Sequence, residues 1–284
     1  MNENFTGHGA ISVAPPAGNP DLREKATASE TGGHSPLRRV DSSGAFAVYY
    51  CDHATSTMDA AFGLAARGRF PEGSSVMAGR QTKGRGQFTR PWVSPPGNLY
   101  ASIRLPQPGR EFPLTPFVLA LAVNRVLSGL GLFAEFKWPN DILVNRKKAG
   151  GILVEERSGV TVAGVGLNLA SAPPDSELRD SRSIPAICLN VCGVSRQPLA
   201  LWRELAGSIM DHLDRFRACP DRNGLVRSLE KNLAFMGERV VTASAGGHEI
   251  PATVSGLSES GGIRLKTQEG EKILFSGSIL PLIC

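Results

Sequence analysis

The stretch KWPNDILVNRKKAGGILVEE, residues 137–156, decides the fold of this chain. Within it, residues 142–144 and 152–154 are short apolar runs, partly β-branched and bounded by turn-forming residues. Runs of this kind and length are typical of buried strands. The basic segment 145–148 joins them and is the predicted hairpin connection. The pattern therefore predicts a β-hairpin with a strongly basic turn.

Lys148 is the candidate in this hairpin for holding an anionic ligand. It lies at the start of the second predicted strand, just before Gly150 and Gly151, which allow a ligand to approach without interference from a Cβ atom. Most lysine-rich hairpins are solvated turns, and residues 146–148 taken alone fit that interpretation. The Trp-Pro-Asn-Asp segment at 138–141 favours a site instead, because a rigid turn followed by an amide and a carboxylate suits a hydrated metal ion or ribose hydroxyls.

The same stretch resembles the signature of biotin protein ligases, which activate biotin with ATP and attach it to a lysine of a carboxylase carrier domain. The resemblance rests on KWPND at 137–141, the basic hairpin, and K-x-x-G-I-L-V-E at 148–155. It implies that Lys148 lies at the biotin carboxylate and the α-phosphate as the first catalytic candidate, and that Gly151 belongs to the biotin site. The implied ATP or adenylate residues here are Lys137, Asn140 and Asp141, of which Asn140 and Asp141 are also the candidate magnesium ligands.

A second motif, RQTKGRGQFTRPW at residues 80–92, combines glycines with arginines. Exposed backbone N–H groups and guanidinium forks hold carboxylates and phosphates well, although such a loop alone is more often mobile and solvated. It resembles the ligand loop of the ligases, Q-T-x-G-R-G-R-x-G-R-x-W, except that Gln87 and Thr89 stand where the family usually has Arg and Gly. The resemblance assigns Gln81, Arg85, Gly86 and Gln87 to biotin and Arg85, Arg90 and Trp92 to ATP or the adenylate, with Arg85 as the second catalytic candidate.

Two further segments complete the implied site. A strand predicted at 45–51 leads to Ser56, Thr57 and Met58, where a helix running to about residue 67 begins. A Ser-Thr helix cap needs no function, but the family has S-T-N here as a biotin contact, so Met58 replaces a polar residue. A strand predicted at 160–169 ends in GVGLN, and the resemblance places Gly166 and Asn168 of this segment near the adenylate.

Composition and charge restrict the class of protein. With 284 residues, 41% hydrophobic and 20% charged, the chain fits one large core and a small second domain. The longest apolar run, 117–123, is too short to span a membrane, and the N-terminus lacks a secretory signal, so we expect a cytoplasmic protein. Five irregularly spaced cysteines do not fit a disulfide framework or a zinc site. Residues 67–110 contain seven arginines and one lysine against one acid, which favours an anionic partner.

Three regions follow from the patterning. Residues 1–45 are rich in small residues and proline without apolar periodicity, which predicts a disordered tail and no helix-turn-helix repressor domain. Residues 46–235, with helices predicted at 114–130, 198–217 and 222–233, form the predicted catalytic domain. The resemblance implies an α+β fold there, a mixed sheet packed with helices of the class II synthetase-like biotin/lipoate ligase type. Residues 236–284 show short alternating runs between glycine-rich turns, which predicts a small SH3-like β-barrel.

The resemblance implies biotin and ATP with magnesium as the small molecules, and a biotin carboxyl carrier protein or carrier domain as the partner. We expect no DNA and no membrane partner, and a homodimer is among the alternatives. One rival is a lipoate or octanoate ligase, whose usual R-R-x-S-G-G-G loop is absent here. A rival of another class is a non-catalytic nucleotide- or nucleic-acid-binding module, which the basic segment motivates.

Overall fold

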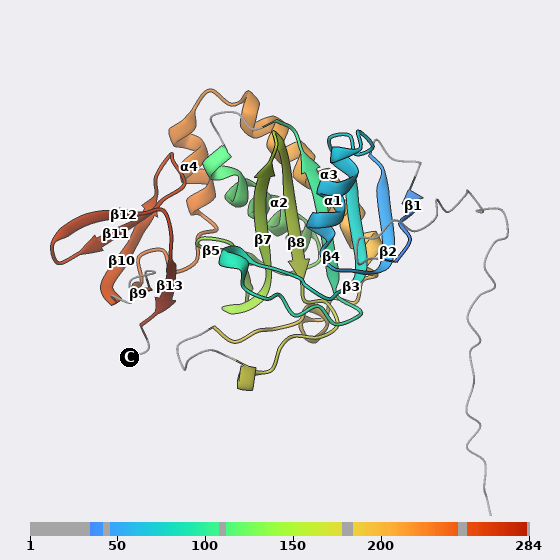
Figure 1. Cartoon of the computed structure of the whole chain (residues 1–284). Helices are drawn as coiled ribbons and strands as arrows, with labels where there is room; N and C mark the ends of the chain where they lie inside the picture. The colour runs from blue at the N-terminus through green and yellow to red at the C-terminus, as the bar shows by residue number, and fades with distance from the viewer. Residues whose placement is uncertain (1–34, 42–45, 108–111, 178–183, 244–248, 283–284) are drawn as a thin grey trace, which may run out of the picture.

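The computed structural model describes residues 35–41, 46–107, 112–177, 184–243 and 249–282, and within them the chain forms two sheets (Figure 1). The large sheet has the strand order β1-β2-β3-β4-β8-β7-β6-β5 and the small one β12-β11-β10-β9-β13. The large sheet is mixed, because β2 and β3 are parallel and the other neighbours are antiparallel. Its strands are β1 (Arg38–Asp41), β2 (Val48–Ala54), β3 (Ser75–Gln81), β4 (Leu99–Leu105), β5 (Ala134–Lys137), β6 (Asp141–Val144), β7 (Lys147–Arg157) and β8 (Val160–Leu167).

Helices cover both faces of the large sheet. Helix α1 (Thr57–Ala66) packs on one face, and α2 (Thr115–Gly129) and α3 (Pro198–Ala218) pack on the other, as Figure 1 shows. The alternation of side chains along β8 sorts its residues between the two faces, since Val165 joins the main core and Val162 joins the cluster under α1. Residues of the same parity as Val162 therefore face the side of the sheet that carries α1.

The central hairpin is confirmed, with β6 and β7 joined by a two-residue turn. Asn145 and Arg146 both have positive φ, 50° and 62°, as the tight turns favoured in hairpins require. The turn is shorter than the sequence pattern predicts, because β7 begins at Lys147. Lys148 thus lies inside a strand and not in the connection.

Two short edge strands were not predicted. Strand β1 pairs with β2 and lies inside the predicted tail, so that prediction is wrong for Arg38–Asp41, whereas residues 1–34 lie outside the described residues. Strand β5 pairs with β6 at the other edge of the sheet. Both have only four residues, too few to show a period of two in the sequence.

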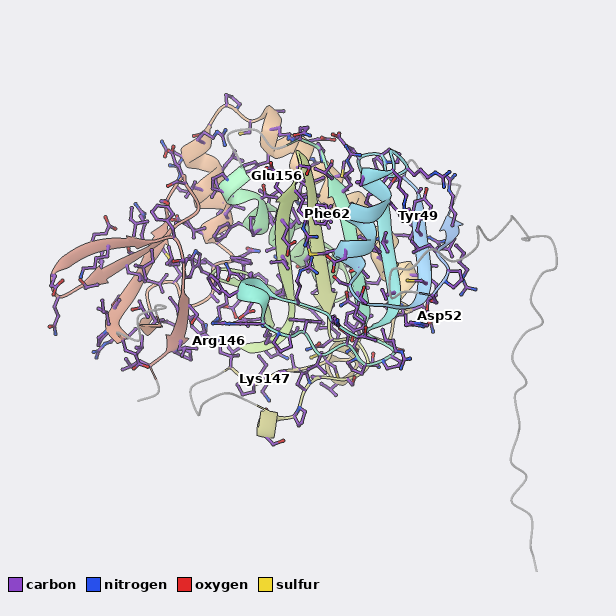
Figure 2. The ribbon with its side chains drawn as sticks, viewed as in Figure 1. Tyr49, Asp52, Phe62, Arg146, Lys147 and Glu156 are labelled. Carbon is purple, nitrogen blue, oxygen red and sulfur yellow. The ribbon has the colours of Figure 1, made fainter. Side chains whose placement is uncertain are left out.

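The small C-terminal sheet is antiparallel, which confirms the predicted second β unit. Its strands are β9 (Arg239–Ala243), β10 (Glu249–Leu257), β11 (Ile263–Thr267), β12 (Gly270–Leu274) and β13 (Ser278–Pro281), and α4 (Arg222–Glu230) precedes them. Two contacts join this small sheet to the β6–β7 hairpin and the residues just before it. Trp138 Nε1 donates to the Gly261 carbonyl at 3.3 Å, and Arg146, which Figure 2 shows beside this sheet, pairs with Glu238 at 2.5 Å. Among the described residues no helix is both long and apolar enough to cross a membrane.

Candidate active site

A cavity opens on the α1 face of the large sheet, beneath the loop of residues 82–93, which carries most of the motif at 80–92. The cavity is narrow in this structure, with a volume of about 40 Å³, and it opens to solvent. Many predicted site residues line it: Ser56, Thr57, Met58, Gln81, Arg85, Gly86, Trp92, Asn140, Gly151 and Gly166. The fold therefore brings together residues from α1, the loop, β7 and β8 that are far apart in the sequence.

Lys148 and Lys137 share one carboxylate beside this cavity. Lys148 Nζ lies 2.6 Å from Asp141 Oδ1, and Lys137 Nζ lies 3.0 Å from Asp141 Oδ2. Burial alone would raise the pKa of Asp141, but the charges and hydrogen bonds of the two lysines outweigh it and lower that pKa to about 2. Because two ammonium groups share one carboxylate, the cluster keeps a net positive charge. The side chain of Lys137 is 5% exposed and that of Lys148 is 33% exposed, so Lys148 is the cation that a ligand can reach.

A β-bulge sets the direction of Lys148. Residues three apart in a regular strand point to opposite faces, so Lys148 and Gly151 would lie on different sides of an unbroken β7. The register of β6 and β7 shifts between the pairs Ile142↔Gly150 and Leu143↔Lys148, and Ala149 is the extra residue. The bulge re-aims the side chain of Lys148, whose Nζ lies 5.2 Å from the ring centroid of Trp92. The bulge depends on how β6 and β7 pair, and no pattern in the local sequence indicates it.

Trp92 lies across two strand glycines. Gly151 and Gly166 are register partners on β7 and β8. A Cβ atom on Gly166 would lie 2.9 Å from the indole of Trp92, and one on Gly151 would lie 3.2 Å from it. The two glycines are needed so that the ring can reach the sheet. The indole Nε1 is buried and has no acceptor among the described residues.

Gln81 connects the start of α1 to the loop. Its Oε1 accepts from the Thr57 backbone N–H at 2.9 Å, and its Nε2 donates to Ser94 Oγ at 3.1 Å. Thr57 Oγ1 also lies 2.7 Å from Ser102 Oγ. Met58 is 3% exposed and packs in the small core under α1, so it gives this part of the cavity an apolar wall.

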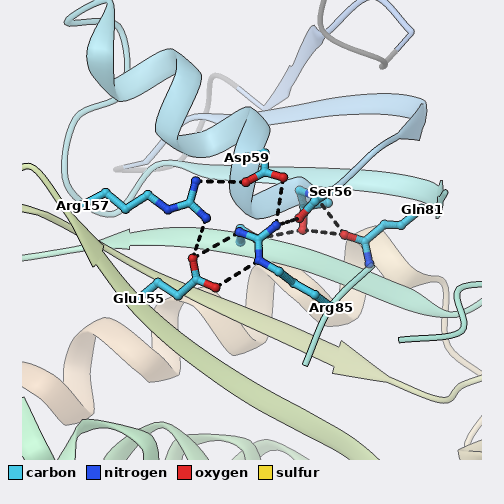
Figure 3. Close-up of polar contacts among 8 residues, drawn as sticks. Ser56, Asp59, Gln81, Arg85, Glu155 and Arg157 are labelled. Atoms are coloured by element: carbon cyan, nitrogen blue, oxygen red, sulfur yellow. Dashed lines mark hydrogen bonds and ion pairs between the residues drawn. The ribbon is translucent and has the colours of Figure 1, made fainter. Parts of the chain in front are cut away.

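Arg85 is held by a closed ring of charges (Figure 3). Its guanidinium donates to both carboxylate oxygens of Glu155, at 3.0 and 3.1 Å, and to Asp59 at 2.8 Å. Arg157 closes the ring by donating to Asp59 at 3.0 Å and to Glu155 at 2.7 Å. Arg85 also donates to Ser56 Oγ at 3.1 Å. The structure therefore shows the predicted catalytic arginine bound to the protein's own carboxylates, an arrangement that the sequence analysis missed.

Six predicted site residues lie outside the cavity lining: Lys137, Asp141 and Lys148, described above, and Gln87, Arg90 and Asn168. Gln87 begins a 3₁₀ turn, η1 (Gln87–Thr89), in the loop, and the carbonyl of Arg90 accepts from the Gly86 N–H at 2.7 Å. Asn168 is buried, and its Nδ2 donates to the carbonyls of Lys148, at 3.4 Å, and Ile187, at 3.3 Å. Asn168 thus supports the strand that carries Lys148.

Asp141 does not fit the predicted magnesium site, because both of its carboxylate oxygens are taken by ammonium groups. Asn140, the other predicted ligand, lines the cavity. A divalent cation at Asp141 would have to displace a lysine that is favourably paired. Within the described ranges no cluster of three or more His, Cys, Asp or Glu residues is suited to a metal ion.

Comparisons with known proteins identify the family of this chain. Residues 50–170 match the model of the biotin/lipoate A/B protein ligase family. A biotin–[acetyl-CoA-carboxylase] ligase of Paracoccus denitrificans is 30% identical in an alignment of 213 positions that covers 70% of this chain and 86% of that protein. This chain belongs to the biotin protein ligase family. The predicted resemblance and fold class are therefore confirmed.

Other members of the biotin protein ligase family extend the similarity. The bifunctional ligase/repressor of Bacillus subtilis is 38% identical over 145 residues, and this chain spans 44% of its length. The biotin protein ligase of Aquifex aeolicus, solved with biotin and ATP, superposes with a TM-score of 0.69 at 27% identity. That similarity covers 82% of this chain and 97% of the Aquifex chain. The structural similarity thus extends beyond the two motifs at residues 80–92 and 137–156.

Proposed function

We propose that this chain activates biotin with ATP to biotinyl-5′-AMP and transfers the biotin to a lysine of a biotin carboxyl carrier protein or carrier domain. One observation carries the proposal. Lys148, fixed by Asp141, lies over the ring of Trp92, which lines a cavity together with other residues that the ligase resemblance assigns to biotin and the adenylate. The name of the Paracoccus relative supports a carboxylase carrier, and the Aquifex complex supports biotin and ATP as substrates.

The reaction has two steps. In the first, an oxygen of the biotin carboxylate attacks the α-phosphorus of ATP, and pyrophosphate leaves. In the second, the amine of the carrier lysine attacks the biotinyl carbonyl carbon, and AMP leaves. Both transition states gather negative charge on phosphate or carbonyl oxygens, so a fixed cation and N–H donors lower both barriers.

Lys148 is the cation proposed to act in both steps. Asp141 keeps its ammonium in place, and the net positive charge of the cluster favours an anion beside it. The glycines at 151 and 166 leave room for the Trp92 ring, which forms an apolar wall suited to the bicyclic part of biotin. None of these roles requires a covalent enzyme intermediate.

The test measures biotin-dependent release of pyrophosphate from ATP and avidin detection of a carrier protein after incubation. Parallel reactions with lipoate address the lipoate ligase alternative, which would release pyrophosphate with lipoate and not with biotin. A non-catalytic binding module would release none with either acid. The expected absence of a DNA partner, the homodimer alternative and the cytoplasmic location stay predictions from the sequence.

A further inference from the structure

The charged ring around Arg85 joins three separate parts of the chain. Arg85 comes from the loop of residues 82–93, Asp59 from α1, and Glu155 and Arg157 from β7. Each carboxylate accepts from both arginines, so positive and negative groups alternate around the ring. A network of this kind holds its members more firmly than an isolated surface pair does.

We propose that Asp59, Glu155 and Arg157 are positioning residues that latch the loop of residues 82–93 over the cavity through Arg85, and so set how long the activated intermediate is retained. The retention part rests on the proposed function. The latch itself is a statement about the unliganded protein.

Exposure and side-chain packing fit a latch more than a ligand site. The side chain of Arg85 is 17% exposed and that of Glu155 is 24% exposed, so their bidentate pair is shielded from solvent, whereas Asp59 and Arg157 are about half exposed. The guanidinium of Arg157 also lies 4.4 Å from the ring centroid of Phe62 on α1. Stacking on an aromatic ring orients an arginine, so Arg157 is held in position to bridge the two carboxylates.

The tip of the loop has a backbone conformation that an anchor would help to maintain. At its tip Phe88 has a left-handed backbone, with φ 56° and ψ 39°, and its side chain is 55% exposed. This conformation is unfavourable for a residue with a side chain. Backbone bonds from Gly86 to Arg90 and from Trp92 to Gly84 close the loop on itself, and bonds from Thr82 to Ala54 and from Lys83 to Thr55 hold its first residues. The Trp92 ring packs on the glycines of β7 and β8, and the side chain of Arg85 adds ion pairs to α1 and β7.

The first test uses limited chymotrypsin digestion of the unliganded protein. Cleavage after Phe88, identified by mass spectrometry, reports loop opening. Cleavage after Phe275, which is 63% exposed and directly follows β12, is the internal reference. We expect Glu155→Gln to speed cleavage after Phe88 about tenfold relative to Phe275. High salt should reproduce part of the effect in the wild type, because it screens exposed pairs. The matched control is Glu156→Gln, which neutralises the exposed neighbour on β7.

The second test measures the dissociation rate of preformed biotinyl-5′-AMP. Glu155→Gln should speed release about tenfold while the rate of adenylate formation at saturating substrates changes less than about threefold. Asp59→Asn should act in the same direction, and its half-exposed position provides a variant that folds if Glu155→Gln does not. A purely structural contribution would instead lower the melting temperature with unchanged release and unchanged cleavage after Phe88.

The two proposals fail separately. If the wild type forms no adenylate, the proposed function fails, while the digestion still tests the latch. If Glu155→Gln and Asp59→Asn are cleaved after Phe88 at the rate of Glu156→Gln, the latch is overturned whatever the activity shows.

Discussion

Lys148 Nζ lies 2.6 Å from Oδ1 of Asp141, on the neighbouring strand. A bond between two ionised groups is stronger than a neutral one, and here it fixes a long, flexible side chain that would otherwise sample many rotamers. The second oxygen of Asp141 is held by Lys137, which is almost fully buried. The carboxylate therefore positions one ammonium group and neutralises another, and the two roles predict different consequences on mutation.

Lys148→Ala should lower the rate of adenylate formation by about 10²-fold or more, the usual scale for one electrostatic partner of a transition state. The side chain is 33% exposed, so its loss leaves no buried cavity, and circular dichroism should show an unchanged fold. Lys147→Ala is the matched control, because Lys147 is exposed at the hairpin end of β7 (Figure 2). Equal activity of the two variants, or a normal rate for Lys148→Ala, would contradict the assignment of Lys148.

Asp141→Asn should lower the free energy of unfolding near pH 7 by about 3 kcal/mol, because it leaves Lys137 buried without a counter-charge. The lowered pKa of Asp141, about 2 in the folded state, also predicts a pH dependence. The ion pairs stabilise the wild type above about pH 4, and this stabilisation is lost as the pH falls from about 4 towards 2.

Urea unfolding at about pH 7 and about pH 3 checks both statements. The wild type should lose more stability between these values than Asp141→Asn does. Asp211→Asn is the control, because Asp211 pairs with Arg215 on the surface of α3, where such pairs contribute about 0.5 kcal/mol or less. If the wild type and Asp141→Asn lost the same free energy of unfolding between the two pH values, the lowered pKa of Asp141 would be contradicted.

Much of the fold follows from periodicity in the sequence. Helices α2 and α3 and the β6–β7 hairpin are long or strongly patterned, and they lie close to where the pattern places them. Strands β1 and β5 have four residues each and are fixed by pairing with a neighbour, which no local pattern records. The predicted tail was therefore too long.

Only part of the candidate site could be predicted from the sequence, for a similar reason. Residues within contiguous motifs, such as Gln81, Trp92 and Gly151, could be found because their spacing resembles a known family, and they line the cavity. The bulge that aims Lys148 depends on register. The partners of Arg85 come from α1 and β7, and nothing in their local sequence connects them.

Strand β1 predicts that two N-terminal truncations behave differently. Deleting residues 1–43 removes Leu37 and Val40, which pack against the hydrophobic clusters, and should lower the melting temperature by roughly 2–6 °C. Deleting only residues 1–34 keeps β1 and should preserve both stability and biotinylation. Thermal unfolding of the two proteins beside the full chain provides the comparison. If the two truncated proteins have the same melting temperature, β1 contributes nothing to stability.

Gln87 is the position where this chain departs most informatively from the family pattern. The resemblance implies an arginine there that helps to close the loop over the adenylate, and a charge-assisted bond to phosphate is about twice as strong as a neutral one. Gln87 follows Gly86, which lines the cavity, so an added cation at this position is near enough to act on a bound anion. We expect Gln87→Arg to slow the dissociation of preformed adenylate several-fold and to reduce the labelling of bystander lysines. The same change at an exposed glutamine before α3, Gln197→Arg, controls for net charge. Equal dissociation rates for the wild type and Gln87→Arg would contradict the role proposed for position 87. Faster dissociation from Arg90→Ala would then show that Arg90 already supplies the cation.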